Sequence, residues 1–146
     1  MPMIDVYAAT GTFSDPRKLA QELASTLMAI EQVPDIPMFR KNTAAFVHDL
    51  PTAAISDVAG SGDHVRVQVL TPAGILDRDK QIGVVAELTE IVATAAGDPG
   101  LAARTWVLVY ESPDGGWGIG GKAMTGADIA TAARAEMAAA AGQSQD

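Results

Sequence analysis

Residues 65–96 read VRVQVLTPAGILDRDKQIGVVAELTEIVATAA, and this stretch predicts the fold of the chain. Residues 65–71 alternate apolar and polar side chains, as a half-buried strand does. A short turn follows, Asp77 is placed to cap a helix, and residues 78–96 predict that helix, with Gly97 as its C-cap. Its core-facing residues are expected to be Ile82, Val85, Leu88 and Val92.

The same arrangement occurs nearer the start of the chain. Residues 3–9 predict a strand, and Ser14 or Asp15 can cap a helix over residues 16–32. The apolar residues of this helix recur at helical spacing at Leu19, Leu23, Leu27 and Ile30. A strand at 42–50 completes the first unit, and a strand at 105–112 completes the second.

Residues of like type recur at a nearly constant separation in the two units. Three pairs lie 63 residues apart: Gly11 and Gly74, Ser14 and Asp77, and Asp35 and Asp98. After a one-residue deletion, Thr43 and Thr105, and Pro51 and Pro113, lie 62 apart. Two unrelated amphipathic segments can match by chance, but turn residues, caps and strand-end prolines matching in one order favour a duplicated β-α-β unit.

The duplication predicts an α/β fold with a four-stranded mixed sheet and two helices on one face. Each crossover holds a helix, so each strand pair should be parallel and right-handed. The other sheet face would stay bare, which favours oligomerisation. We expect a single domain over 1–146, with unit one at 2–60, unit two at 64–122, and a C-terminal helix and tail at 123–146.

Composition excludes several classes of function. The chain of 146 residues carries a net charge of −8 and no cysteine. This charge disfavours nucleic acid as a partner, and the missing cysteine excludes disulfides and thiolate chemistry. No apolar run approaches the ~20 residues that span a bilayer, so a cytoplasmic protein that binds no membrane is expected. Two isolated histidines make no metal site, and no cofactor is expected.

The chain begins MPMIDVY, which places Pro2 just ahead of the first strand. Removal of Met1 would leave Pro2 as a free secondary amine at the end of a buried strand. Such an amine can act as a base if burial and a nearby cation lower its proton affinity toward neutral pH. The matching position of the second unit, Val65, is internal, so one such site per chain is expected.

Three features together resemble the tautomerase superfamily: Pro2, the duplicated unit, and ESPDGGWGIGG at 111–121. The resemblance covers residues 2–122. It is to the fused double β-α-β type, which includes macrophage migration inhibitory factor, malonate semialdehyde decarboxylase and cis-3-chloroacrylic acid dehalogenase; 4-oxalocrotonate tautomerase has a single unit. It implies a barrel-like homotrimer with Pro2 at a subunit interface. Pro2 would act as general base on a small enol or keto acid, or as a protonated acid in hydration, dehalogenation or decarboxylation.

The chain departs from this family at the carboxylate-binding arginines. The family positions map onto four uncharged residues: Thr12, Ile75, Trp106 and Ala44. This disfavours a dicarboxylate substrate and dehalogenase chemistry. The hairpin aromatic is retained as Trp117.

Four residues remain as candidate substrate-binding groups. Trp117 and Trp106 are candidate pocket walls, although Trp106 could equally be interface core. Arg40 and Arg104 are candidate carboxylate anchors, although both could be solvated charges at strand entrances.

Three functions follow as hypotheses. The first is a tautomerase-like isomerase that uses Pro2 on a phenylpyruvate-like aromatic enol. The second keeps the same amine for decarboxylation or hydration of a small unsaturated or 3-oxo acid. The third is a catalytically silent trimeric binding or scaffold protein. If Met1 stays attached, the Pro2 nitrogen is an amide and cannot act as a base.

Overall fold

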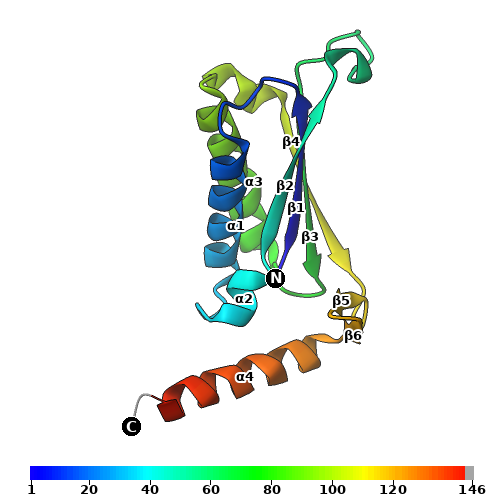
Figure 1. Cartoon of the computed structure of the whole chain (residues 1–146). Helices are drawn as coiled ribbons and strands as arrows, with labels where there is room; N and C mark the ends of the chain where they lie inside the picture. The colour runs from blue at the N-terminus through cyan, green and yellow to red at the C-terminus, as the bar shows by residue number, and fades with distance from the viewer. Residues whose placement is uncertain (144–146) are drawn as a thin grey trace.

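The computed structural model describes residues 1–143 and shows an α/β fold (Figure 1). The main sheet contains β1 (Met3–Ala9), β2 (Ala44–Leu50), β3 (Val65–Pro72) and β4 (Thr105–Ser112), and a hairpin contains β5 (Trp117–Ile119) and β6 (Lys122–Met124). The α-helices are α1 (Pro16–Glu31), α2 (Pro37–Lys41), α3 (Arg78–Ala96) and α4 (Gly126–Gln143). Two short 3₁₀ segments are η1 (Thr52–Ala54) and η2 (Pro99–Arg104).

The order of strands in the main sheet is β2-β1-β3-β4. Both outer pairs are parallel, as the two crossovers require, and the central β1–β3 pair is antiparallel. Met3 lies opposite Ala44 on one side and Leu70 on the other. The predicted four-stranded mixed sheet is therefore confirmed.

Helix caps explain where α1 and α3 begin and end. The Asp15 carboxylate accepts a hydrogen bond from the Lys18 backbone nitrogen at 3.0 Å, so Asp15, and not Ser14, caps α1. Asp77 caps α3 in the same way, through the Lys80 nitrogen at 2.9 Å. Gly97 ends α3 with a left-handed φ of 65°, as its sequence position predicts.

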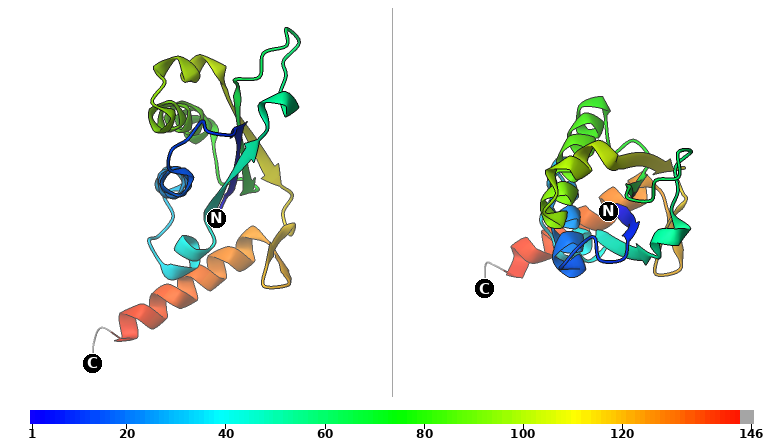
Figure 2. Two further views of the ribbon diagram at one scale, coloured as in Figure 1. Left: turned by 45° about the horizontal axis from the view of Figure 1, so that its top comes forward. Right: turned by 90° about the horizontal axis from the view of Figure 1, so that it is seen from above.

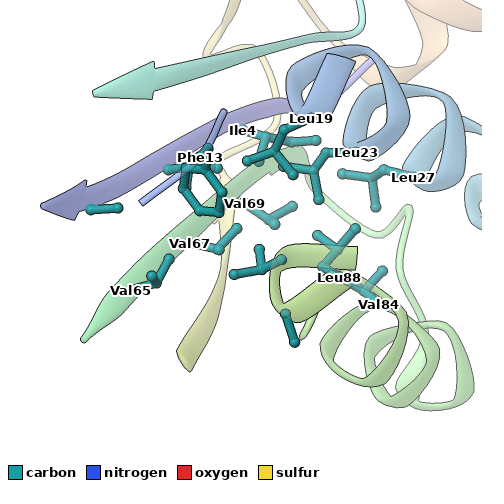
Figure 3. Packing of buried hydrophobic residues seen from close by; sticks show 14 of the residues in the cluster. Ile4, Phe13, Leu19, Leu23, Leu27, Val65, Val67, Val69, Val84 and Leu88 are labelled. Carbon is teal, nitrogen blue, oxygen red and sulfur yellow. The ribbon is translucent and has the colours of Figure 1, made fainter. Parts of the chain in front are cut away.

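The principal core lies between the two helices and one face of the sheet (Figure 3). Leu19, Leu23 and Leu27 of α1 are fully buried, as predicted, and pack toward the valines of β3. On α3 the buried residues are Val84, Leu88, Val92 and Ala93. The prediction was wrong for Ile82 and Val85, which are 53% and 41% exposed. Ile82 lies about 120° around the helix from Leu88, so it cannot reach the same face.

Figure 2 shows both α1 and α3 on the same side of the sheet, so neither helix covers the opposite face. Its exposed apolar side chains are Phe46 (52%), Trp106 (50%), Tyr110 (49%), Leu70 (41%) and Leu108 (36%). Polar side chains share this face, where His48 contacts Asp5 at 2.6 Å and stacks on Tyr7. The predicted bare face is thus present, and it is amphipathic.

Two glycines of α3 provide a matched test of these assignments. Gly83→Ala should stabilise the fold by about 0.5–1 kcal/mol, because a methyl group there meets nothing within 4 Å and alanine favours the helix. Gly97→Ala should destabilise it by about 1–2 kcal/mol, because its left-handed backbone disfavours a side chain. Urea unfolding at one fixed protein concentration measures both changes. Midpoints that move in the same direction would contradict the assignment of the end of α3.

Candidate active site at the start of the first strand

The amino terminus, where Pro2 is the second residue, lies at the end of the sheet near α2, α4 and the β5–β6 hairpin (Figure 1). It is buried, and its carbonyl oxygen accepts a hydrogen bond from the Ala44 nitrogen at 3.3 Å. This bond extends the parallel β1–β2 ladder by one residue. The Pro2 backbone is therefore part of the sheet and does not belong to a loose terminal segment.

A second hydrophobic cluster surrounds the residue that precedes Pro2. Its buried members are Met1, Phe39, Trp117, Ile129 and Ala133, each no more than 7% exposed. They come from the amino terminus, α2, β5 and α4, so this cluster joins segments that are far apart in the sequence. The Met1 side chain is packed among them at 2% exposure.

Specific hydrogen bonds fix the start of the C-terminal helix and join it to α2. The Asp128 carboxylate accepts from the Thr125 nitrogen at 2.9 Å, and this bond lowers the pKa of Asp128. Glu136 accepts from the Met38 backbone nitrogen of α2 at 3.2 Å. The α4 helix therefore covers the amino-terminal cluster with its Ile129 and Ala133 side chains.

The hairpin that carries Trp117 has the geometry its sequence predicts. Gly120 and Gly121 form its two-residue turn, with φ of 57° and 80°. Positive φ at both positions matches the right-handed twist of a hairpin, and glycine meets this need without steric cost. Trp117 is the first residue of β5 and belongs to the same buried cluster as Met1, where it is 6% exposed.

A buried carboxylate, Glu31, lies beside the amino terminus. It is the last residue of α1 and is 4% exposed. Its Oε2 accepts a hydrogen bond from the Met1 ammonium at 3.0 Å, and its Oε1 accepts from the Thr71 hydroxyl at 3.4 Å. Burial lowers the pKa of the Met1 amine below its usual value, and the negative charge of Glu31 acts in the opposite direction. The site thus holds an amine in a shielded environment next to one carboxylate.

Two cavities lie near this end of the sheet. One, of about 380 Å³, is lined by Met3, Asn42, Leu70, Ser112 and the hairpin from Gly116 to Gly120, including Trp117. The other, of about 650 Å³, lies between α1, α2 and β2 and reaches Arg40 and Asp35. The first has the retained aromatic in its wall and adjoins the residue after Pro2, so it is the better candidate for substrate.

The two arginines proposed as carboxylate anchors are each already engaged by aspartates. Arg40 forms a two-pronged pair with Asp35, with Nη2 to Oδ2 at 2.6 Å. Arg104 pairs with Asp98 at 2.7 Å in the corresponding segment of the second unit. These arginines lower the pKa values of Asp35 and Asp98. In the single chain, each arginine is thus an ion-paired charge ahead of a strand, and a role in carboxylate binding stays a prediction.

The structure brings some of the predicted site residues together and separates others. Trp117 lies at the Pro2 end of the sheet, and Arg40 lies nearby on α2. Trp106 and Arg104 lie at the opposite end, because β4 runs parallel to β3, which is antiparallel to β1. Trp106 stacks on His64 there, with ring centroids 4.7 Å apart. A role for Trp106 or Arg104 at Pro2 would therefore need a second subunit, and it stays a prediction.

Sequence reasoning missed Glu31 and Phe39. A signal for Glu31 was present, because Leu19, Leu23 and Leu27 recur every fourth residue and position 31 continues that buried row. Phe39 belongs to α2, a five-residue helix that no sequence pattern predicted. Its burial depends on contact with Met1 and α4, which sequence spacing does not reveal.

No protein-family model and no curated protein sequence matches the chain. Solved structures do match. A fused 4-OT described as a symmetric trimer aligns with a TM-score of 0.71 at 15% identity, over 87% of this chain and 98% of that one. A member of the cis-3-chloroacrylic acid dehalogenase family aligns at 0.70 and 20% identity, covering 88% and 89%. A malonate semialdehyde decarboxylase inhibited by 3-bromopropiolate aligns at 0.61 and 17%, covering 81% and 88%.

These neighbours are members of the tautomerase superfamily. The chain has the fold of that superfamily in its fused, double β-α-β form, which confirms the resemblance predicted from the sequence. Within residues 1–143, no helix has the length and apolar character needed to cross a membrane.

Proposed function

We propose that the chain is a cytoplasmic, tautomerase-like isomerase in which Pro2, after removal of Met1, acts as general base. The observation that supports this most directly is the burial of Pro2 at the start of β1, in the fold of the fused tautomerases. A buried amine has a lowered pKa, since desolvation disfavours its charged form. The lowered pKa of the Met1 amine, one residue away, supports the same effect at Pro2.

The proposed reaction moves one proton from oxygen to carbon. The Pro2 nitrogen takes the enol hydroxyl proton, which leaves an enolate. The C=O bond forms as the C=C electron pair of this enolate takes the proton from the Pro2 ammonium at carbon. The products are the keto form and the free amine, so the base is regenerated. A general base placed in this way typically contributes about 10²–10⁴-fold to the rate.

An apolar substrate suits the surroundings of this amine. Removal of Met1 would vacate space between Phe39, Trp117 and Ile129, directly beside the new terminus. Apolar space of this kind favours an apolar group and does not hold water well. We therefore propose a phenylpyruvate-like enol as the test substrate, with its ring in this space or in the adjoining cavity lined by Trp117.

Two other functions each have one observation in their favour. The Glu31 carboxylate would stabilise a protonated Pro2, which supports proline-acid chemistry such as decarboxylation or hydration. The burial of Met1 and its ion pair with Glu31 would instead support a silent binding protein if Met1 is retained. The mass of the native chain separates this last case from the other two.

We also propose that the chain assembles as a homotrimer. The amphipathic, uncovered sheet face supports this, since large exposed apolar surfaces mark interfaces. Two fused 4-OT structures that it resembles are described as trimers, one symmetric and one asymmetric. In such a trimer, Trp106 and Arg104 of one subunit would lie at the interface that this subunit forms with the exposed sheet face of its neighbour.

Intact-mass measurement combined with covalent labelling tests the state of the amino terminus. We expect native protein to lack Met1 and a small electrophilic acid to add one label per chain, mapped to Pro2. No label should map to Pro2 in protein that keeps Met1, because the Pro2 nitrogen is then an amide. Native protein that retains Met1 would contradict the proposed isomerase and favour the silent binding protein.

A further inference from the structure

We propose that Glu31 is the ion-pair partner of the Pro2 amine in the processed chain, and that it positions this amine and holds up its proton affinity. The inference rests on the proposed function only in assuming that Met1 is removed. It assigns to Glu31 a role that neither the sequence pattern nor the solved neighbours suggested.

The argument begins with the present partners of the Glu31 carboxylate. Among the contacts of residues 1–143, the Met1 ammonium at 3.0 Å is the one cation bonded to it. The other bond comes from the Thr71 hydroxyl at the longer distance of 3.4 Å. Lys80 of α3 lies close, but its Nζ donates to the Glu31 backbone carbonyl at 3.2 Å and not to the carboxylate.

Removal of Met1 would leave this carboxylate buried without its cation. An unpaired charge in a buried site is strongly disfavoured. The same cleavage creates a new amine on Pro2, the next residue along the chain, and consecutive Cα atoms are only about 3.8 Å apart. The glutamate side chain has enough rotatable bonds to follow the amine over this distance, so the ion pair can re-form one residue inward.

The other charged groups around the site do not compete for this role. Glu136 of α4 is bonded to the Met38 nitrogen, and Arg40 of α2 is paired with Asp35 in an exposed position. Lys80 of α3 is bonded through its Nζ to the Glu31 backbone carbonyl, so it is not a partner of the new amine. The charge nearest to the new amine would therefore be negative, and it would raise the pKa of Pro2 relative to an apolar site of equal burial.

Direct titration of the amine tests this inference without relying on turnover. Processed protein, checked by intact mass, is labelled with [¹⁵N]proline, and the Pro2 nitrogen is titrated by NMR in wild type, Glu31→Gln and Glu22→Gln. Glu22 is an exposed glutamate of the same helix and serves as the matched control. We expect the pKa of the Pro2 amine to fall by about 1–3 units in Glu31→Gln and to stay unchanged in Glu22→Gln.

The pH dependence of kcat/KM for enol ketonisation provides a second readout. The active base is the neutral amine, so activity rises with pH through its pKa. Loss of the Glu31 charge lowers that pKa, and the acidic limb should move to lower pH by the same 1–3 units. Circular dichroism checks that the variants are folded.

Glu31→Asp is the variant to use if Glu31→Gln does not fold. It keeps the charge but moves it one methylene away, so the amine pKa should fall by less than in Glu31→Gln. An amine pKa equal to that of wild type in folded Glu31→Gln, or in Glu31→Asp, would overturn the inference. A shifted amine in a chain that shows no ketonisation would instead refute the isomerase and leave the ion pair established.

Discussion

Pro2→Ala is expected to lower kcat/KM for ketonisation of a phenylpyruvate-like enol by at least about 10²-fold. The proline ring fixes φ and holds the nitrogen in one direction relative to β1. An alanine terminus presents a primary amine that can rotate away from the substrate, and it loses the ring contacts of a buried residue. The comparison uses processed protein of both variants, verified by intact mass and assayed by the loss of enol absorbance.

The matched control is Pro16→Ala, which changes an exposed proline at the start of α1. It should leave kcat/KM within about twofold of wild type, since it is far from the amine and surface changes have small effects. A chain that retains Met1 should show no ketonisation above the background rate. Turnover by Pro2→Ala equal to that of wild type would reject Pro2 as the base.

Leu108→Asp is expected to convert the proposed homotrimer into monomers. Leu108 lies midway along the edge strand β4 on the uncovered sheet face, opposite Gln68 on β3, and is 36% exposed in the single chain. A carboxylate buried there at each subunit contact would lack a partner, at a cost of several kcal/mol per charge. Size-exclusion chromatography with light scattering measures the change from the mass of three chains to that of one.

Val85→Asp provides the control for this second experiment. Val85 is 41% exposed on the outer surface of α3. Its replacement by aspartate introduces the same negative charge, but on the opposite side of the molecule. This variant should remain trimeric, because the proposed interface is the sheet face and not the helical layer. Monomers formed by Val85→Asp, or trimers that persist in Leu108→Asp, would place the interface elsewhere.

Several elements were predictable because short-range patterns specify them. The strand at 105–112 and the helix at 78–96 were predicted with the bounds that the structure shows, since alternation, capping and breaker residues act locally. The second strand begins at Ala44 and not at 42, because Asn42 ends α2 by bonding back to Phe39. The buried face of α3 was misjudged at Ile82, because every face of that helix carries apolar residues.

The candidate site was predictable only in part. Pro2 was chosen from its position behind Met1 and Trp117 from the resemblance to the tautomerase superfamily, and both lie at one end of the sheet. Arg104 was chosen because it precedes a strand, and the strand directions put it at the other end. The chain's order of elements alone does not reveal which end of a mixed sheet a given residue occupies.

The sequence by itself determined the duplicated strand-helix-strand plan, because each unit repeats its own turn glycine, helix cap and apolar period. Only the tertiary structure decided that Glu31 lies buried against the amino terminus and that α4 covers the cluster around Met1. The residues in those contacts are separated by between 30 and more than 100 positions in the sequence. The energies of the contacts depend on burial and charge pairing. These burial and charge-pairing energies arise only when the chain is folded. Local sequence patterns therefore do not reveal these contacts.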